Sequence, residues 1–322
     1  VVGPLAWGGM WVGLLLERSR MKRLETDPTP PLPDTPPTVT VIVPAKDESA
    51  DIADCINRIR QLDYPDFRII AVNDRSTDDT GAILDTLARE ESRLRVIHVT
   101  ELPEGWLGKC HALHVAQQQT TSEWILFIDS DVVVEPSALT AVLATATTRK
   151  FDAVSILTRL RADTIWEKII LPPAALSWGV MLGISLTNDD GQTRRAAANG
   201  QFLLVRASAY RAAGGHQAVR QCIVEDVELM RALKHAGSRV RLYTGFHLAR
   251  TRMQTNLRQI FHGWARIYSG TARRRPWPMV GGIVFVLLAV LSAIPMLVVS
   301  IVRGDEWGML AAGAHLLIMH LY

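Results

Sequence analysis

Two carboxylates separated by one residue are the side chains of this sequence best suited to chemistry. Asp129 and Asp131 come directly after residues 123–128, a mainly apolar run that predicts a buried strand. In an open α/β sheet, ligands bind outside the carboxyl ends of the strands. Two acids at that edge can hold a hard divalent cation together with the phosphates of a bound nucleotide. The alternative is a solvated turn, so the pair needs support from the rest of the chain.

Acidic residues also follow two other predicted strands. Glu48 comes after the strand predicted over residues 38–43, and Asp74 after the strand predicted over residues 67–72. Three acidic strand ends at one sheet edge would repel one another unless a cation or ligand hydrogen-bond donors lay between them. A ribose, a nucleobase and a metal-bound diphosphate would supply those partners. For Asp74 alone, a turn that caps the next helix is the alternative.

Two further candidates lie at the starts of predicted helices. Lys109 places a positive charge at the positive end of a helix dipole, which is unfavourable. A phosphate bound between the lysine and the helix N-terminus would reverse that cost. The alternative for Lys109 is an exposed lysine. Glu225 and Asp226 precede a helical run and could simply cap it. In an acceptor site, the same acids could instead provide a general base that removes a hydroxyl proton.

Alternating strands and helices must position these residues. Beyond the three strands already named, strands are predicted over residues 95–99, 152–158, 199–205 and 240–243. Helices are predicted over residues 51–62, 78–91 and 109–119, from 136 onward, and over 208–213 and 225–236. This alternation predicts an α/β fold with a mainly parallel sheet covered by helices on both faces. The sequence lacks a glycine-rich dinucleotide fingerprint after its first strand and a Walker A loop, which argues against both kinds of nucleotide site.

Apolar segments near both ends of the 322-residue chain predict membrane attachment. Residues 279–302 carry no charge. At about 1.5 Å per residue they are long enough to cross a hydrocarbon core of about 30 Å. Residues 308–322 begin a further apolar stretch, and residues 1–17 resemble the end of another. The chain does not begin with Met, and we expect it to be part of a longer, multi-pass membrane protein.

Basic residues beside these segments predict the orientation of the central domain. Clusters within residues 18–23 and 273–275 flank that domain, so the positive-inside rule places it on the cytoplasmic side of the cell (inner) membrane. The apolar residues 166–187 contain Pro172-Pro173 and predict either a helix lying in the membrane surface or a buried core helix. The mild net charge of +3 and the lack of a nucleic-acid-binding motif argue against a nucleic-acid partner.

The predicted domains follow from these segments. They are a partial transmembrane helix (1–17), a basic and proline-rich linker (18–37), a catalytic α/β domain (38–245), an interfacial basic and aromatic segment (246–276), a transmembrane helix (279–302) and the start of a further transmembrane helix (308–322).

Six motifs in sequence order resemble those of family 2 glycosyltransferases of the GT-A type. They extend over about residues 38–270, which is most of the part between the apolar ends. The motifs are Val43-Pro44-Ala45-Lys46-Asp47-Glu48, Val72-Asn73-Asp74-Arg75-Ser76-Thr77-Asp78, Gly108-Lys109 with Ala112-Leu113, Asp129-Ser130-Asp131, Asn199-Gly200-Gln201-Phe202 and Val224-Glu225-Asp226. Arg250-Thr251-Arg252-Met253 followed by Gly263-Trp264 is similar to the membrane-anchored branch that includes hopanoid-associated and carotenoid glycosyltransferases.

The resemblance implies inverting transfer from a nucleotide-diphosphate sugar with Mg²⁺ or Mn²⁺. It implies Asp226 as the base beside Glu225, and Asp131 with Asp129 as the residues for metal and diphosphate. The implied nucleotide-sugar-binding residues are Pro44, Ala45, Glu48, Asp74, Lys109, Asp129 and Ser130. The implied residues on the acceptor and diphosphate side are Asn199, Gly200, Gln201, Arg252, Trp264 and Arg266.

The expected activity is transfer of a single sugar to a lipid acceptor of isoprenoid type at the cytoplasmic membrane face. One alternative is a processive polysaccharide synthase. Such synthases carry Gln-x-x-Arg-Trp, whereas here His262-Gly263 stands before Trp264 without the arginine. Another alternative is a catalytically silent membrane protein that binds a nucleotide sugar. Asp47 stands where many family members have asparagine, a small departure from the motif.

Overall fold

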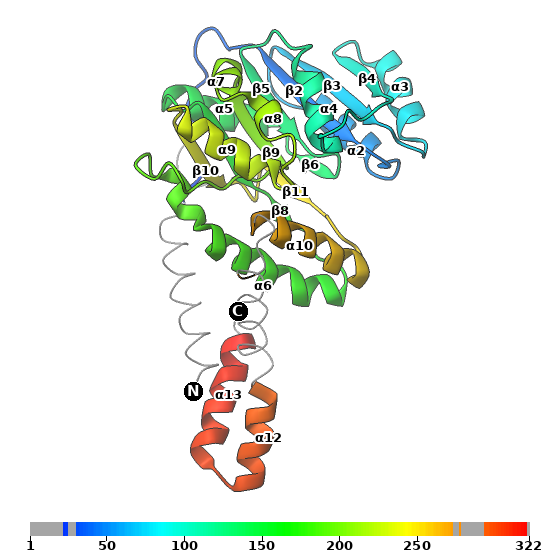
Figure 1. The fold of residues 1–322 in the computed structure, drawn as a ribbon. Helices are drawn as coiled ribbons and strands as arrows, with labels where there is room; N and C mark the ends of the chain where they lie inside the picture. The colour runs from blue at the N-terminus through cyan, green and yellow to red at the C-terminus, as the bar shows by residue number, and fades with distance from the viewer. Residues whose placement is uncertain (1–21, 25–29, 273–276, 278–292, 321–322) are drawn as a thin grey trace.

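The computed structural model describes residues 22–24, 30–272, 277 and 293–320 (Figure 1). The membrane segment predicted over residues 1–17 lies outside the described residues, as does most of the one predicted over 279–302. The centre of the described chain is an eight-stranded sheet with the strand order β1-β10-β7-β9-β5-β2-β3-β4. Its strands are β1 Lys22–Arg23, β2 Val39–Ala45, β3 Phe67–Asp74, β4 Leu94–Val99, β5 Trp124–Ile128, β7 Ala153–Leu157, β9 Phe202–Arg206 and β10 Val240–Thr244.

The prediction of a mainly parallel α/β sheet is confirmed. The strand pairs on either side of β2, β3 and β10 are all parallel. One strand runs the other way, because β9 pairs antiparallel with both β5 and β7. Every residue of β2 and β5 is buried, as expected for strands covered on both faces.

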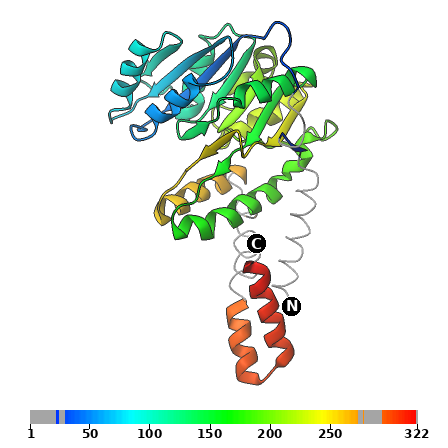
Figure 2. The same ribbon diagram turned by 180° about the vertical axis from the view of Figure 1, so that it is seen from behind.

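Helices cover both faces of this sheet (Figures 1 and 2). Alternate residues of β2 enter opposite cores, with Val41 in one and Ile42 in the other. One core is shared with α2 Ile52–Arg60, α3 Thr80–Glu90 and α5 Ala138–Thr148. The other is shared with α4 Gly108–Gln117, α7 Ala207–Ala212 and α9 Glu225–His235. The short helix α8 Gly215–Ala218 packs against α4 and α9.

A second, three-stranded sheet was not predicted from the sequence. It consists of β6 Val132–Val134, β11 Ala249–Thr251 and β8 Arg159–Leu160, with β11 antiparallel to β6 and parallel to β8. Strands of two or three residues are too short to show a period-2 pattern. β6 follows the acidic residues at the end of β5, and β8 and β11 each precede one of the two helices that lie below the sheets.

Two helices form that layer beneath the sheets (Figure 1). They are α6 Ile165–Leu182 and α10 Leu257–Thr271, which share a small apolar core containing Leu171, Ile260 and Trp264. The helix predicted within residues 166–187 is present, and α6 continues as one helix through Pro172-Pro173 to Leu182. It ends at Gly183, which adopts φ +60°, and the short 3₁₀ helix η1 Ile184–Asn188 follows.

The last described residues form a helical hairpin. It consists of α12 Ala293–Arg303 and α13 Glu306–His320, joined at Gly304 with φ +65°. Within the described ranges, no helix combines the length and the apolar character needed to cross a membrane. The predicted membrane-spanning helices are therefore not confirmed by the part of the chain that the structure describes.

Candidate active site

The residues predicted from separate motifs meet at the carboxyl edge of the large sheet. Asp129 follows β5, Lys109 begins α4, Gly200 precedes β9 and Glu225-Asp226 begins α9. All of them line one small cavity, which places residues more than 100 positions apart around a common space. The cavity is lined by Pro44, Lys109, Leu113, Phe127, Asp129, Gly200, Leu203, His216, Glu225 and Asp226.

Lys109 joins two of these acidic motifs. Its Nζ lies 2.7 Å from Oδ1 of Asp129 and 2.9 Å from Oε1 of Glu225. Burial alone would lower the pKa of Lys109, but the two carboxylates raise the pKa well above its usual value. The lysine is therefore a fixed positive charge at the start of α4, where a helix N-terminus also favours an anionic ligand.

Asp226 is held by backbone donors rather than by an ion pair. Gly200 N–H donates to Oδ2 over 2.7 Å, and Val227 N–H donates to Oδ1 over 2.8 Å. Burial and then the adjacent Glu225 raise the pKa of Asp226 to about 7, while Lys109 and both N–H groups oppose that rise. A carboxylate with such a pKa suits general base catalysis near neutral pH.

Asp131 and its neighbours have the donor chemistry of a site for a hard cation. Burial raises the pKa of Asp131 to about 7, and the negative charges of Asp129 and Glu48 add to this rise. A cation would relieve that repulsion, and all the oxygen donors are of the kind that Mg²⁺ or Mn²⁺ prefers. Among the described residues, no three His, Cys, Asp or Glu side chains are grouped so that they could hold a metal alone. Asp131 and Asp129 fit the common arrangement in which one or two carboxylates bind the cation and substrate phosphates complete its coordination.

Asp74 is already paired within the protein. Arg75 donates from Nε to Oδ1 over 2.7 Å and from Nη2 to Oδ2 over 2.9 Å. Gly108 lies so close that an added Cβ would be 2.5 Å from Asp74 Oδ2 and 2.7 Å from Arg75 Nη2. Arg75 is therefore the partner of a predicted site residue, and this pairing was not predicted from the sequence. The signal for it was a charged residue placed directly after Asp74 in a turn.

Four other predicted nucleotide-sugar residues surround this edge. Pro44 lines the cavity at the end of β2, and Ala45 and Ser130 are buried beside it. Burial, followed by the charge of Asp51, raises the pKa of Glu48.

Asn199 and Gln201 hold the backbone around Gly200. Ser155 Oγ accepts Asn199 N–H over 2.8 Å and donates to the Asn199 carbonyl over 3.1 Å. The Asn199 amide donates to the Ile156 carbonyl over 3.1 Å, and Gln201 accepts a hydrogen bond from Thr158. The side chains of the motif therefore build the turn, and its glycine reaches Asp226.

Trp264 and Arg266 belong to α10, and Arg252 directly follows β11; none of the three is in the cavity lining. Arg252 binds Glu167, with its Nε 2.9 Å from Oε1 of a carboxylate that is fully buried. Trp264 is buried between α6 and α10. Arg266 is exposed on α10, near enough for its charge to act on Asp129.

His216 is a cavity residue that sequence reasoning did not identify. Its Nδ1 lies 2.7 Å from the Tyr210 hydroxyl, and its backbone N–H donates to the same oxygen over 2.8 Å. Burial lowers the pKa of His216 to about 3, so the imidazole is neutral at physiological pH. Apart from the two glycines before it, no local pattern marks His216 as a cavity residue.

Comparison with known proteins gives the site a context. The sequence model described as Glycosyl transferase family 2 matches residues 40–211. A 4,4'-diaponeurosporenoate glycosyltransferase of Staphylococcus aureus is 27% identical over 243 residues, which make up 74% of this chain. The match extends over 63% of the length of that relative, so the chain spans less than two thirds of it.

Solved structures share the fold. The mannosyltransferase PcManGT from Pyrobaculum calidifontis, solved with GDP-Man and Mn²⁺, is 20% identical to this chain, with a TM-score of 0.61. The match covers 98% of this chain and 85% of the PcManGT chain. TarS 1-349 from S. aureus, solved with UDP-GlcNAc, is 18% identical to this chain, with a TM-score of 0.50. The match covers 69% of this chain and 60% of the TarS chain. The likeness establishes a GT-A-like fold.

Proposed function

The chain belongs to glycosyl transferase family 2, and we propose that it moves one sugar from a nucleotide-diphosphate sugar to an isoprenoid-type lipid. That it is a glycosyltransferase follows from the family. The observation that carries the proposal is the cavity in which Asp226, with a pKa of about 7, lies beside the Lys109–Glu225 pair. The name of the S. aureus relatives supports the acceptor class.

The proposed reaction is a single displacement with inversion at the sugar. The Asp226 carboxylate takes the proton of the acceptor hydroxyl or carboxyl group as the acceptor oxygen bonds to the anomeric carbon. The bond from that carbon to the diphosphate oxygen breaks at the same time. Lys109, at the N-terminus of α4, lies where it would bind the departing diphosphate.

Asp131 and Asp129 would hold Mg²⁺ or Mn²⁺ at this site. When bound, the ion would neutralise charge on the leaving diphosphate. The Mn²⁺ of the PcManGT complex supports this assignment.

Exposed apolar side chains on the helical layer support a site at the membrane. Ile165, Trp166 and Ile169 of α6 are 63%, 49% and 57% exposed, and Phe261 of α10 is 70% exposed. Apolar side chains on one surface beside basic residues are typical of helices that lie in a membrane interface. We therefore favour the interfacial reading of residues 166–187, on the cytoplasmic face of the inner membrane, with residues 1–17 and 279–302 as anchors.

Transfer of label tests the proposal. Membranes that contain the full-length protein are incubated with a panel of radiolabelled nucleotide sugars, and label is counted in the organic phase. We expect label from one sugar nucleotide, with one sugar per acceptor, and none with the Asp226→Asn variant. A ladder of oligomers would instead identify a processive synthase. Failure of every donor to label lipid would contradict the proposed acceptor.

A further inference from the structure

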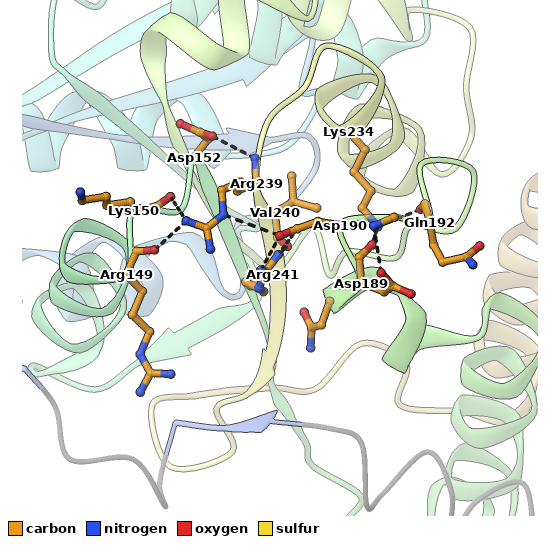
Figure 3. Close-up of polar contacts among 12 residues, drawn as sticks. Arg149, Lys150, Asp152, Asp189, Asp190, Gln192, Lys234, Arg239, Val240 and Arg241 are labelled. Carbon is orange, nitrogen blue, oxygen red and sulfur yellow. Dashed lines mark hydrogen bonds and ion pairs between the residues drawn. The ribbon is translucent and has the colours of Figure 1, made fainter.

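A lysine outside the cavity lies in a shell of backbone carbonyl groups. Lys234, near the end of α9, has its Nζ 2.9 Å from the Asp189 oxygen, 3.0 Å from that of Gln192 and 2.9 Å from that of Arg195. The Leu186 oxygen lies 3.5 Å away. Figure 3 shows the lysine pointing from its helix into the loop that carries these groups. The side chain is buried, and it occupies the place that a monovalent cation takes in a carbonyl site.

We propose that Lys234 is a positioning residue, whose ammonium group organises the loop of residues 186–195 and so holds Gly200 against Asp226. The inference rests on the proposed role of Asp226 as the base. It concerns how that base is oriented, which the reaction alone does not explain.

The loop of residues 186–195 is held mainly by hydrogen bonds and ion pairs rather than by regular secondary structure. It is polar, contains Gly191 and forms no strand or helix after η1. On its outer side Arg241 binds Asp190 through Nη1–Oδ1 and Nη2–Oδ2 contacts of 2.6 and 3.0 Å (Figure 3). The Asn188 side chain also pairs with the backbone of Leu242. These contacts tie the loop to β10. The ammonium ties it to α9, as does Arg231, whose Nε donates to the Arg194 carbonyl over 3.1 Å.

One face of α9 connects the loop to the cavity. Asp226, Met230 and Lys234 are spaced four residues apart, so they lie along a single face of the helix. Eight residues at about 1.5 Å each place the ends of this row about 12 Å apart. The chain from Arg195 to Gly200 therefore touches the same helix at both ends, at Lys234 through a carbonyl and at Asp226 through an N–H.

Most of the segment between these two attachments is buried and apolar. Ala196, Ala197 and Ala198 have no polar side chain to fix them, and the following Asn199 is attached to β7 through Ser155 and Ile156. Ala197 N–H donates to Thr187 Oγ1 over 2.7 Å, so the loop is closed at its base by its own residues. Without the ammonium, several carbonyl dipoles would point at one another, and the loop would spread and carry Gly200 with it.

Two variants remove the ammonium in different ways. Lys234→Met keeps the bulk of the stem, and Lys234→Ala leaves space for propylammonium to enter. The matched control is Lys150→Ala, since the Lys150 side chain is exposed and its backbone carbonyl would still accept from Arg239 (Figure 3). Hydrogen exchange at residues 196–201 and steady-state transfer are measured in the full-length protein.

We expect exchange at the Gly200 amide to rise at least tenfold in both Lys234 variants. We expect kcat to fall about tenfold while KM for the nucleotide sugar stays within twofold, and propylammonium, but not propanol, to restore Lys234→Ala. Unchanged exchange and kcat in folded Lys234→Met would overturn the inference. If the native protein transfers no sugar, the exchange measurement still decides the inference, so its failure is distinguishable from that of the proposed function.

Discussion

At the scale of single residues, the proton affinity of Asp226 is the balance of opposed effects. Burial and the charge of Glu225 raise its pKa, while Lys109 and the N–H groups of Val227 and Gly200 lower it, leaving a value of about 7. An ordinary aspartate would be ionised at neutral pH but would accept a proton only weakly. The surroundings therefore make this carboxylate a stronger base without keeping it protonated.

Asp226→Asn should abolish most of the turnover. We expect kcat to fall by about 10²–10⁴, because a general base contributes that much, with nucleotide-sugar binding unchanged. In the native protein, kcat should rise with pH through about 7, since the base must be deprotonated. Rate measurements between pH 5 and 9 check both statements. Asp54→Asn on the surface of α2 is the control, and near-normal turnover in Asp226→Asn would remove Asp226 from this role.

Gly200→Ala should damage catalysis without changing any charge. An added Cβ would lie 3.3 Å from Asp226 Oδ2 and 3.4 Å from Lys109 Nζ, so it would crowd both groups. We expect kcat to fall by up to about 10²-fold, the cost of a misplaced catalytic group. Gly313→Ala, where no atom lies within 4 Å of the added Cβ, should keep full activity. Equal rates for the two variants would contradict the close fit at Gly200.

Site residues with a chemical signature could be predicted from the sequence, but their partners could not. Asp129, Lys109 and Asp226 were marked by charge at the ends of predicted elements. Ser155, which holds Asn199 from a distant strand, has no local signature. Arg252 was placed on the acceptor and diphosphate side from the resemblance, and its buried partner Glu167, 85 residues away in the sequence, could not be predicted.

At the scale of elements, the buried Glu167 fixes the first turn of α6. It accepts hydrogen bonds from the backbone N–H groups of Asp163 and Thr164 and from Arg252. The Arg252 hydrogen bond is the main cause that lowers the pKa of Glu167, to about 2. One carboxylate thus joins the helix start to β11.

Glu167→Gln should destabilise the protein by about 2–3 kcal/mol at pH 7, the usual worth of hydrogen bonds to a charged group. Because the folded pKa is depressed, the contribution is present above pH 4.5 and is lost as the pH falls towards 2. The variant should lose this part of the acid dependence. Denaturant unfolding at pH 7 and pH 3 checks it, with the exposed Arg161→Gln as control. Equal free energies of unfolding for Glu167→Gln and Arg161→Gln at pH 7 would show that the Glu167 carboxylate does not stabilise the fold.

Long periodic elements of the fold were predictable, whereas direction and short strands were not. The strands from β2 to β5 were found from their apolar runs, because burial on both faces leaves a clear pattern. The reversal of β9 was not, since a strand reads the same in either direction. β6, β8 and β11 are defined by pairing between distant residues, which no local pattern records.

At the scale of the whole molecule, the α6–α10 layer lies between the sheets and the C-terminal hairpin in both views (Figures 1 and 2). If this layer contacts lipid, Trp166 should be quenched when the full-length protein is reconstituted with brominated lipids. We expect Trp166→Phe to remove a quenched component of the fluorescence. Trp106→Phe should not, since Trp106 packs on His111 and His114 near the nucleotide edge. Equal quenching in the two variants would argue against an interfacial position.

The reversed strand has a consequence for how the protein is made. In the described sheet, β9 alone connects β5 with β7, so it joins the early strands to the late ones. During synthesis β2, β3, β4 and β5 can associate as they leave the ribosome, while β7 has no partner until Phe202–Arg206 emerges. Because Gly200 directly precedes β9 and the acids of α9 follow soon after it, the strand that joins the two parts of the sheet and the last residues of the cavity emerge in the same stretch of the nascent chain.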